Sequence, residues 1–274
     1  MNRIEEIRPD QSIELLKELH ILTREGKLNQ DSRRKLKQVY HLYNFIEPLL
    51  KEIQNIDGNF NLVDHGAGKS YLGFILYDLF FKKLNTGSVI GIETRDDLVS
   101  KSKSLAERFQ FSRMNFFNLT VEESTFSSKI PETVEIVTAL HACDTATDDA
   151  IKFALKKNAK FIVLVPCCQA EVASILRKNK GKNLQKNVLT EIFRHPIHTR
   201  EFGSHITNVL RCLELESRGY QVTVTELIGW EHSMKNELII ARYKNLPQTY
   251  PEQRLKTLIR ELNLEEIEHR FLPI

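Results

Sequence analysis

The chain has 274 residues, a formal net charge of +3 at pH 7 and 41% apolar residues, which suits one packed α/β domain with a small helical appendage. Its longest apolar run, Phe161 to Val165, is too short to cross a bilayer, and the charged start from Met1 to Asp10 is unlike a signal peptide. The four cysteines include an adjacent pair, which excludes a secreted disulfide framework, so we expect a cytoplasmic protein without membrane contact.

Residues 1–56 are expected to form an N-terminal helical region. Apolar residues from Ile13 to Leu22 form one stripe, and those from Leu36 to Leu50 form a second at three- and four-residue spacing. Gly26 and residues 29–32 separate the two helices, with Asp31 or Ser32 as the expected N-cap of the second. The whole region is therefore predicted to be helical.

From Asn59 onward, short apolar strands alternate with helices. The expected strands are residues 60–64, 88–93, 113–117, 134–140 and 161–166, and the expected helices are residues 71–83, 96–109 and 147–157. This alternation predicts a parallel sheet with right-handed crossovers. The nearly continuous apolar runs of the interior strands indicate that helices cover both faces of the sheet.

The last part of the chain has a different pattern. Residues 204–217 are predicted to form a helix, and the strands 221–228 and 237–243 follow with a link too short for a crossover helix. These two strands should therefore form an antiparallel hairpin. The expected fold is a Rossmann-like α/β domain over residues 57–246. Its seven-stranded sheet has five parallel strands plus the antiparallel terminal hairpin, and a C-terminal helix follows in residues 247–274.

The most specific motif is a glycine loop that leaves the first strand at Asp64 and enters a helix. Gly66 and Gly68 allow close approach of a ligand to the backbone, and the helix N-terminus offers unpaired N–H groups. Asp64 can accept hydrogen bonds from the ammonium group of a cofactor. Glu93 ends the next strand, where a carboxylate binds the two ribose hydroxyls of a nucleoside. The alternative interpretation is a tight turn without a ligand.

The end of this loop also resembles a phosphate-binding P-loop, because Gly68 is followed by Lys69 and Ser70. A P-loop requires a glycine five residues before the Gly-Lys pair, however, and Val63 stands there, inside the strand. An ATPase is therefore not expected.

Linked motifs across residues 33–243 resemble a broad family of class I S-adenosylmethionine-dependent methyltransferases, and the expected sheet has the same plan. The motifs are residues 34–38, 64–72, 140–148 with a His-x-Cys-Asp element, and 165–169 with a Pro-Cys-Cys element. This family contains uncharacterised bacterial proteins and eukaryotic proteins named as ribosomal RNA adenine dimethylase domain-containing. The His-x-Cys and Cys-Cys elements are also similar to those of eukaryotic tRNA acceptor-stem ribose methyltransferases.

The resemblance implies that S-adenosylmethionine is the cofactor. It places Asp64, Gly66 and Gly68 at the methionine part of this cofactor and Glu93 at its ribose. Asn118, just after the third strand, would lie near the adenine. Many family members have a third glycine where this chain has Ser70, and serine is small enough to keep the turn.

Two unusual segments, residues 141–144 and 166–169, follow the fourth and fifth strands at the edge where doubly wound sheets bind ligands. Methyl transfer by in-line attack requires positioning and sometimes a base. His141 and Asp144 are therefore candidate positioning or proton-accepting groups, beside thiols that shape the substrate pocket.

Other interpretations of these segments remain open. The cysteines can be buried structural residues, with Thr145 or Thr147 as the cap of the next helix. Alternatively, Cys167 is a nucleophile, as the Pro-Cys cysteine is in cytosine-5 methyltransferases. A zinc site that combines these thiols with His141 lacks the usual ligand spacing, so no structural metal is expected.

Two segments concentrate basic residues, from Arg24 to Lys37 and from Arg177 to Arg200, and the second should lie at the rim of the methyl-transfer edge. This placement suits contact with a phosphate backbone, although lysine-rich segments are also common as solvated surface. The expected function is methyl transfer to RNA, either tRNA or rRNA. The alternatives are a methyltransferase for a protein or small molecule, and a cofactor-binding or RNA-binding module without catalysis.

Overall fold

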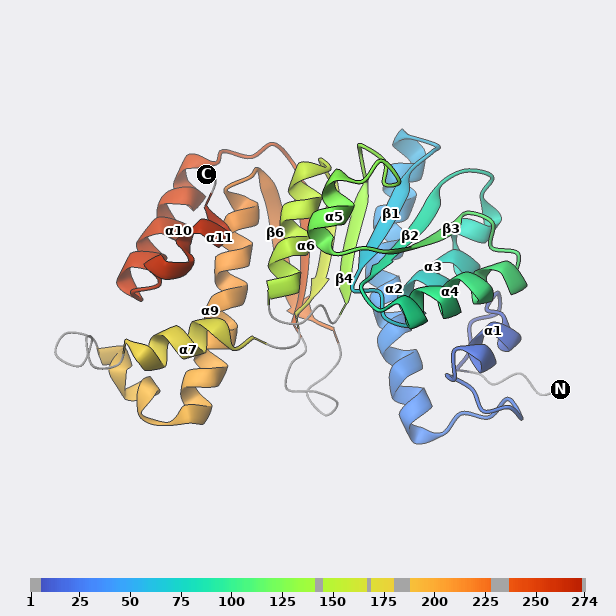
Figure 1. Cartoon of the computed structure of the whole chain (residues 1–274), viewed down its shortest axis with the longest axis horizontal. Coiled ribbons are helices and arrows are strands. Elements are labelled where there is room, and N and C mark those ends of the chain that lie inside the picture. Colours follow the sequence, from blue (N-terminus) through green and yellow to red (C-terminus); the bar gives the residue numbers. More distant parts are fainter. Residues whose placement is uncertain (1–5, 141–144, 167–168, 180–187, 228–236, 273–274) are drawn as a thin grey trace.

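The computed structural model describes residues 6–140, 145–166, 169–179, 188–227 and 237–272. Its centre is a seven-stranded sheet in the order β3-β2-β1-β4-β5-β7-β6 (Figure 1). The strands are β1 (Asn61–His65), β2 (Ser88–Glu93), β3 (Met114–Asn118), β4 (Ile136–Leu140), β5 (Phe161–Val165), β6 (Tyr220–Glu226) and β7 (Glu237–Tyr243). The five first strands are parallel, and β7 runs antiparallel to both β5 and β6. The predicted Rossmann-like fold class is confirmed.

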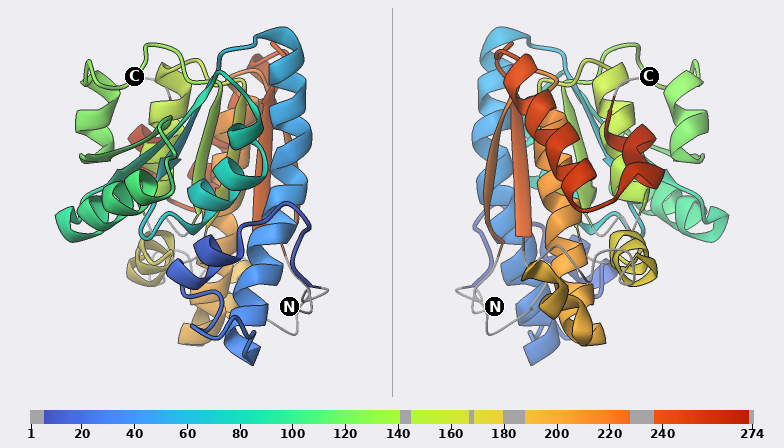
Figure 2. Two further views of the ribbon diagram at one scale, coloured as in Figure 1. Left: turned by 90° about the vertical axis from the view of Figure 1, so that its right-hand side faces the viewer. Right: turned by 90° about the vertical axis from the view of Figure 1, so that its left-hand side faces the viewer.

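Side chains that alternate along β5 enter two different cores. Phe161, Val163 and Val165 pack into the core that contains α2 (Gln30–Ile56), α3 (Tyr71–Leu79) and α4 (Asp96–Arg108). Ile162 and Leu164 pack into the core that contains α6 (Thr145–Lys156) and α9 (Pro196–Glu216). Helices therefore cover both faces of the sheet, as its apolar strands require (Figure 2).

The N-terminal region is helical only in part, so the prediction of a wholly helical region is wrong. α1 covers Ile13–Glu18, and residues 19–29 form turns and irregular backbone before α2 begins. The N-cap of α2 is Asn29 rather than Asp31 or Ser32. The Asn29 backbone is extended, so its side-chain oxygen can accept the N–H of Ser32 at 2.8 Å. α2 buries its apolar face in the same core as the sheet.

A helical unit outside the sheet follows β5. It consists of α7 (Glu171–Lys178), the 3-10 helix η2 (Val188–Arg194), α9 and α10 (Thr249–Glu261), which share a small apolar core. α9 begins at Pro196, well before the predicted residue 204. A proline suits the first helical turn, where its missing N–H is not needed.

The tail is not the single helix that the sequence predicted. α10 ends at Glu261, and η3 (Glu265–Ile267) and α11 (Glu268–Phe271) follow. The break contains Asn263, whose φ of 52° is incompatible with a right-handed helix. The domain boundaries near residues 56 and 246 stay a prediction. Within the described ranges, no helix combines the length and apolar character needed to span a membrane.

Candidate functional site

The carboxyl ends of neighbouring strands bring three of the predicted cofactor residues to one edge of the sheet. Asp64 in β1 lies opposite Gly91 in β2, and Glu93 at the end of β2 lies opposite Asn118 at the end of β3. In Figure 1 this carboxyl edge lies at the bottom of the sheet. Ligands of doubly wound sheets bind at such an edge, so these residues occupy a suitable place for one.

The loop between β1 and α3 depends on backbone conformations that favour glycine. Gly66 and Gly68 have φ values of 63° and 57°. Ser70, the N-cap of α3, is also left-handed at φ 51°, and its buried hydroxyl has no hydrogen-bond partner within the described structure. A left-handed conformation costs an L-residue about 1–2 kcal/mol. This strain explains why a glycine at this position suits the turn better than serine does.

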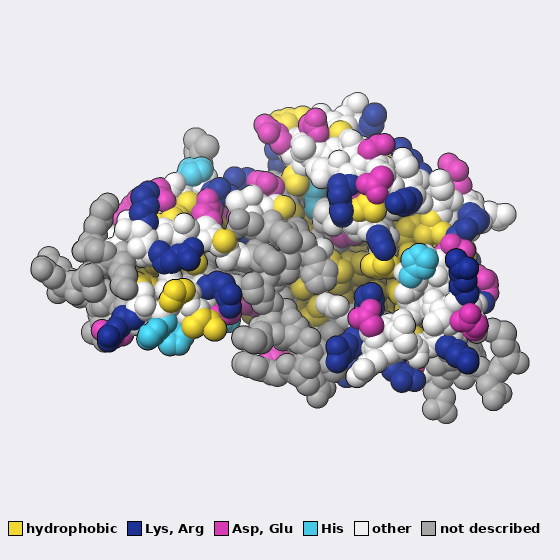
Figure 3. Space-filling view, turned by 60° about the horizontal axis from the view of Figure 1, so that its bottom comes forward, with side chains coloured by type: hydrophobic (Ala, Val, Ile, Leu, Met, Phe, Trp, Pro, Cys, Tyr) yellow, Lys and Arg dark blue, Asp and Glu magenta, His cyan; other side chains and the backbone are white. Residues whose placement is uncertain are grey.

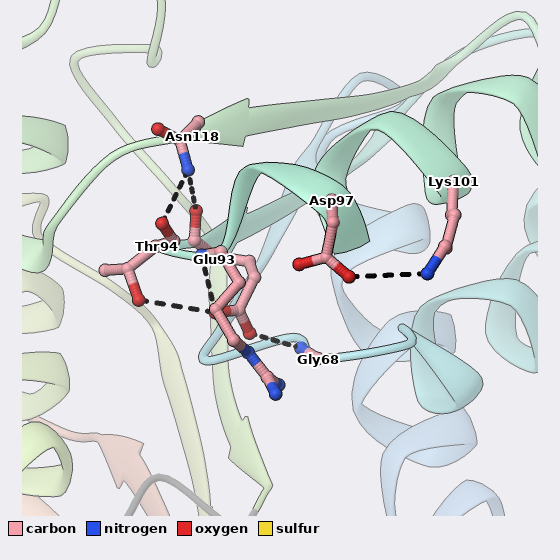
Figure 4. A network of polar contacts seen from close by, with 7 residues as sticks. Gly68, Glu93, Thr94, Asp97, Lys101 and Asn118 are labelled. Carbon is pink, nitrogen blue, oxygen red and sulfur yellow. Dashed lines mark hydrogen bonds and ion pairs between the residues drawn. The ribbon is translucent and has the colours of Figure 1, made fainter.

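The Glu93 side chain, at the end of β2, is hydrogen-bonded to the glycine loop (Figure 4). Its Oε2 accepts the backbone N–H of Gly68 at 2.9 Å, and its Oε1 accepts the backbone N–H of Arg95 at 3.0 Å. Burial by itself raises the pKa of Glu93, but these N–H groups and the Arg95 guanidinium together hold the pKa below its ordinary value. Glu93 is therefore an ionised carboxylate that keeps the loop against β2.

Asn118 directs its amide nitrogen at the backbone that follows β2 (Figure 4). Its Nδ2 donates to the carbonyl oxygens of Glu93 at 3.2 Å and of Thr94 at 2.7 Å. The side chain is exposed and stabilises the turn that leads into α4. Its predicted position near an adenine stays a prediction.

Asp64 is a buried carboxyl with a single hydrogen bond in the described structure. Its side chain is 2% exposed, and it accepts the hydroxyl of Thr138 in β4 at 2.6 Å. Burial raises the pKa of Asp64 to about 7, and the Thr138 hydrogen bond offsets only part of that effect. A cation beside Asp64 would favour its charged form, so this position is suited to an ammonium group.

The next residue, His65, was not weighed as a site residue from the sequence. It is 1% exposed, and its ring meets the ring of Phe153 in α6 edge-on, with 4.3 Å between the centroids. Burial lowers the pKa of His65 to about 3, and neither ring nitrogen has a hydrogen-bond partner within the described residues. His65 is therefore a neutral packing residue beneath the glycine loop.

A buried polar network near the end of β5 was also missed. Arg211 of α9, which is 1% exposed, donates to Asp148 of α6 and to the Oδ1 of Asn208 at 3.2 Å. Asn208 also accepts the Nε2 of Gln169 at 2.7 Å and donates to Glu237 of β7 at 2.8 Å. The network thus connects the helix after β4, the segment after β5, α9 and β7.

The predicted catalytic residues His141, Asp144 and Cys167 lie outside the described residues, as do Cys143 and Cys168. The proposed helix caps are wrong, because Thr145 is the first residue of α6 and Thr147 is buried inside its first turn. In the described part of the chain, no group of three or more His, Cys, Asp or Glu side chains could hold a metal ion.

The two basic segments flank the carboxyl edge on opposite sides (Figure 1). α2 begins within the first segment, and the end of α7, η2 and the start of α9 lie along the second. Part of the charge is neutralised, because Arg33 pairs with Glu6 and Lys178 pairs with Glu266, both at 2.9 Å. Figure 3, which brings this edge forward, shows Lys and Arg side chains around a hollow with hydrophobic side chains in it.

Comparison with known proteins gives a family model and remote relatives. A model described as a methyltransferase domain matches residues 34–175. The chain is 26% identical over 234 residues to a glutathione S-transferase C-terminal domain-containing protein of Bos taurus, covering 79% of this chain and 34% of that protein. It is 23% identical over 231 residues to the Drosophila melanogaster homolog, covering 77% and 37%. The chain thus spans about a third of the length of these curated relatives. A solved structure of the SAH-bound methyltransferase PaMTH1 of Podospora anserina matches 85% of this chain and 88% of its own, with a TM-score of 0.47 and 10% identity.

Proposed function

Because this chain belongs to the methyltransferase domain family, we propose that it transfers a methyl group from S-adenosylmethionine to RNA, either tRNA or rRNA. The cofactor assignment rests on one observation, the placement of buried Asp64 and ionised Glu93 on the two sides of the glycine loop. Within the wider family, we group the chain with members that have the His-x-Cys-Asp and Pro-Cys-Cys motifs.

The residues at this edge fit the methionine and ribose parts of the cofactor. An ammonium group beside Asp64 would stabilise the carboxylate that burial disfavours. Each carboxylate oxygen has about two acceptor positions. Oε1 of Glu93 already accepts from Thr94 and Arg95, whereas Oε2 accepts only the Gly68 N–H among the described residues, so Oε2 can hold the loop and still accept a ribose hydroxyl. A Cβ built on Gly68 would meet no atom nearer than 3.9 Å, so the space beside the loop is open to a ligand.

The chain's own residues would bind and orient the reactants. When bound, S-adenosylmethionine supplies an electrophilic methyl group on its sulfonium sulfur. Asp64 and Glu93 would hold the two ends of the methionine–ribose unit, which determines where the methyl group points. His141 and Asp144, which follow β4 next to β1, are the proposed groups that position the acceptor or take its proton. Cys167 would shape the acceptor pocket without covalent chemistry.

RNA as the acceptor is supported by the two basic segments beside the carboxyl edge. Positive charge on both sides of the edge can contact phosphates on both sides of the nucleotide that is methylated. Neutralised pairs such as Arg33 with Glu6 can still rearrange, because both side chains are about half exposed. RNA binding should therefore weaken steeply with added salt.

Transfer of a labelled methyl group into total RNA, protein and metabolite fractions tests this proposal. We expect the label in RNA. Glu93→Ala should lower the affinity for S-adenosylmethionine by about tenfold or more, because charge-assisted hydrogen bonds to the ribose are lost. Glu93→Gln should lower it less, and Glu132→Ala, which removes an exposed carboxyl, should leave it unchanged.

Two results would contradict the proposal in different ways. Label only in protein or in metabolites would overturn RNA as the acceptor while keeping methyl transfer. Calorimetry that detects no binding of S-adenosylmethionine, even near millimolar concentration, would overturn the use of this cofactor.

A further inference from the structure

We propose that a pocket beside the end of β5 binds one nucleotide of the acceptor RNA through its phosphate and through a base N–H or ribose O–H. This inference rests on the proposed RNA substrate. The pocket has a volume of about 490 Å³ and is lined among others by Gln169, Arg177, Pro196, Ile197 and Arg200. Its size falls in the usual range of small-molecule sites, about 300–1,000 Å³.

The walls of the pocket are two helices that pack closely together. Arg177 lies on α7 and Arg200 lies on α9. Gly203 permits this approach, because a Cβ built on it would lie only 2.7 Å from the backbone nitrogen of Ala173. The relative position of the two arginines is therefore determined by backbone contact between their helices and not by mobile side chains alone.

The two arginines supply positive charge that is largely free to meet an anion. No carboxylate in the described parts of the chain forms an ion pair with Arg177, which is exposed. Among the described residues, Arg200 pairs with its neighbour Glu201 alone, at 3.0 Å, and this solvent-accessible pair contributes little. Glu171, the acid at the start of α7, is bound to Arg270 at 2.8 Å. Guanidinium groups match the geometry of a phosphate, which accepts two N–H groups at once.

Gln169 adds a requirement that a simple anion cannot meet. The side chain is 6% exposed, and its Oε1 is buried without a hydrogen-bond partner in the described structure. The orientation of the Gln169 amide follows from its neighbours. Arg211 donates to one side-chain atom of Asn208, so that atom must be the oxygen Oδ1. The Gln169 atom bonded to the same oxygen must be a donor, which identifies it as Nε2. The Oε1 that remains needs a donor. A base N–H or a ribose O–H provides one, whereas a phosphodiester or a sulfate dianion, which carries no proton, does not.

Apolar surface completes the match to a nucleotide. Pro196 and Ile197 line the same pocket, and Ile197 is 54% exposed, so a flat base could cover it. On the left of Figure 3, Lys or Arg side chains lie around exposed hydrophobic ones. Positive charge, a buried acceptor and apolar surface together fit a nucleotide better than an acidic peptide, which offers no planar base.

Binding of a labelled single-stranded RNA of mixed sequence to the full chain, measured by fluorescence anisotropy, tests the pocket. Arg177→Gln and Arg200→Gln should each lower the affinity about fivefold. Each should also reduce the slope of log affinity against log salt by about 0.7, the value for one lost phosphate contact on a single strand. The matched control is Arg260→Gln, an exposed arginine of α10 outside this pocket, which should bind as the wild type does. Unchanged affinity and slope in both pocket variants would overturn the proposal.

Competition experiments separate a nucleotide site from other anion sites. Inorganic polyphosphate and polyglutamate should displace the RNA about tenfold less well than unlabelled RNA of equal charge. If polyphosphate displaces the RNA equally well, the pocket recognises charge alone. If polyglutamate binds better than RNA, the ligand is an acidic peptide. Either result would overturn the nucleotide assignment.

Calorimetry with S-adenosylmethionine keeps this inference separate from the proposed function. The arginine variants should bind the cofactor with wild-type affinity, because α7 and α9, which carry the arginines, lie on the opposite side of the molecule from α3, which follows the glycine loop (Figure 1). If the wild type fails to bind the cofactor, the proposed function fails, and the RNA-binding series still decides whether the pocket exists. If the wild type fails to bind RNA, the pocket proposal fails.

Discussion

Cofactor affinity should depend on the ionisation of Asp64. Burial raises the pKa of Asp64 to about 7, so the carboxyl is largely neutral in mildly acidic solution. Only its ionised form attracts an ammonium group. An α-amino group has an ordinary pKa of about 7.7–8.0, so the ammonium of S-adenosylmethionine stays mostly protonated up to pH 7. Affinity should therefore rise as the pH rises from about 5.5 to 7.

The size of this effect follows from the pKa. With a pKa of about 7, roughly 3% of Asp64 is ionised at pH 5.5 and roughly half at pH 7. The dissociation constant should therefore fall about fifteenfold across this interval. Asp64→Asn should remove the pH dependence and lower the affinity at pH 7 by about 1.5–3 kcal/mol, the usual contribution of a hydrogen bond to a charged group. Thr138→Val removes the hydrogen bond that lowers the pKa, so it should move the rise in affinity to higher pH.

Isothermal titration of S-adenosylmethionine into the full chain at constant ionic strength measures this dependence. Asp57→Asn, which removes an exposed carboxyl, is the control and should keep the wild-type pH profile. The same pH profile in Asp64→Asn and the wild type would refute the reasoning. In the absence of ligand, the raised pKa of Asp64 also affects the free energy of unfolding, and this effect decreases with rising pH whereas cofactor affinity increases. The folded state retains the Asp64 proton that the unfolded state releases, so the contribution of Asp64 to the free energy of unfolding falls as pH rises from about 4 to 7.

Two further substitutions test the packing around the site. Ser70→Gly should raise the free energy of unfolding by about 1 kcal/mol. Glycine adopts a φ of 51° without strain, and the substitution also removes a buried hydroxyl that has no partner among the described residues. Urea unfolding measures the change, and a loss of stability would contradict this prediction. Arg211→Met should lower the free energy of unfolding by about 3–5 kcal/mol, because the one cation that buried Asp148 would keep among the described residues is Arg270, at 3.9 Å. Adding Asp148→Asn should restore part of this loss, and a double variant no more stable than the single one would exclude an unpaired charge as its cause.

The fold and the position of the glycine loop and Glu93 at the carboxyl edge of the sheet could be predicted because they depend on local patterns. The strand β1, the turn on Gly66 and Gly68 and the start of α3 occupy consecutive residues, and Glu93 is recognisable as the last residue of the next apolar strand. The short final link likewise predicted the antiparallel hairpin that β6 and β7 form. Each of these features requires only residues that are near one another in the sequence.

Other features were missed although a local signal exists. Asn29, Asp31 and Ser32 are all good N-caps by type, and only the extended backbone of Asn29 selects it. The helix α5 (Val121–Phe126) was not predicted, yet Thr120 and Glu123 form a capping box, a pattern that can be read from the sequence. The capping box therefore predicts the start of α5, whereas residue type alone does not select the N-cap of α2 among its three candidates.

The polar network could not be predicted from any local pattern. Arg211 lies 63 residues after Asp148, and Gln169 lies 39 residues before Asn208. Such pairs form only once α6, α9 and the end of β5 have packed together, and most arginines are exposed, so burial of Arg211 has no signature in the sequence. The unpartnered Oε1 of Gln169 is a consequence of this tertiary arrangement.

The two sides of the candidate site are built on different physical principles. On the proposed cofactor side, Asp64 and Glu93 are buried on central strands and bonded to backbone or to a neighbouring strand, so a change there should alter both ligand binding and folding stability. On the proposed acceptor side, Arg177 and Arg200 are exposed on helices outside the sheet, so a change there should alter the affinity for RNA and leave stability nearly unchanged. Gln169 combines the two properties, since its Nε2 is part of the buried network, its buried Oε1 has no hydrogen-bond partner among the described residues, and the residue also lines the pocket. Gln169 is therefore the position at which we expect acceptor affinity and stability to change together.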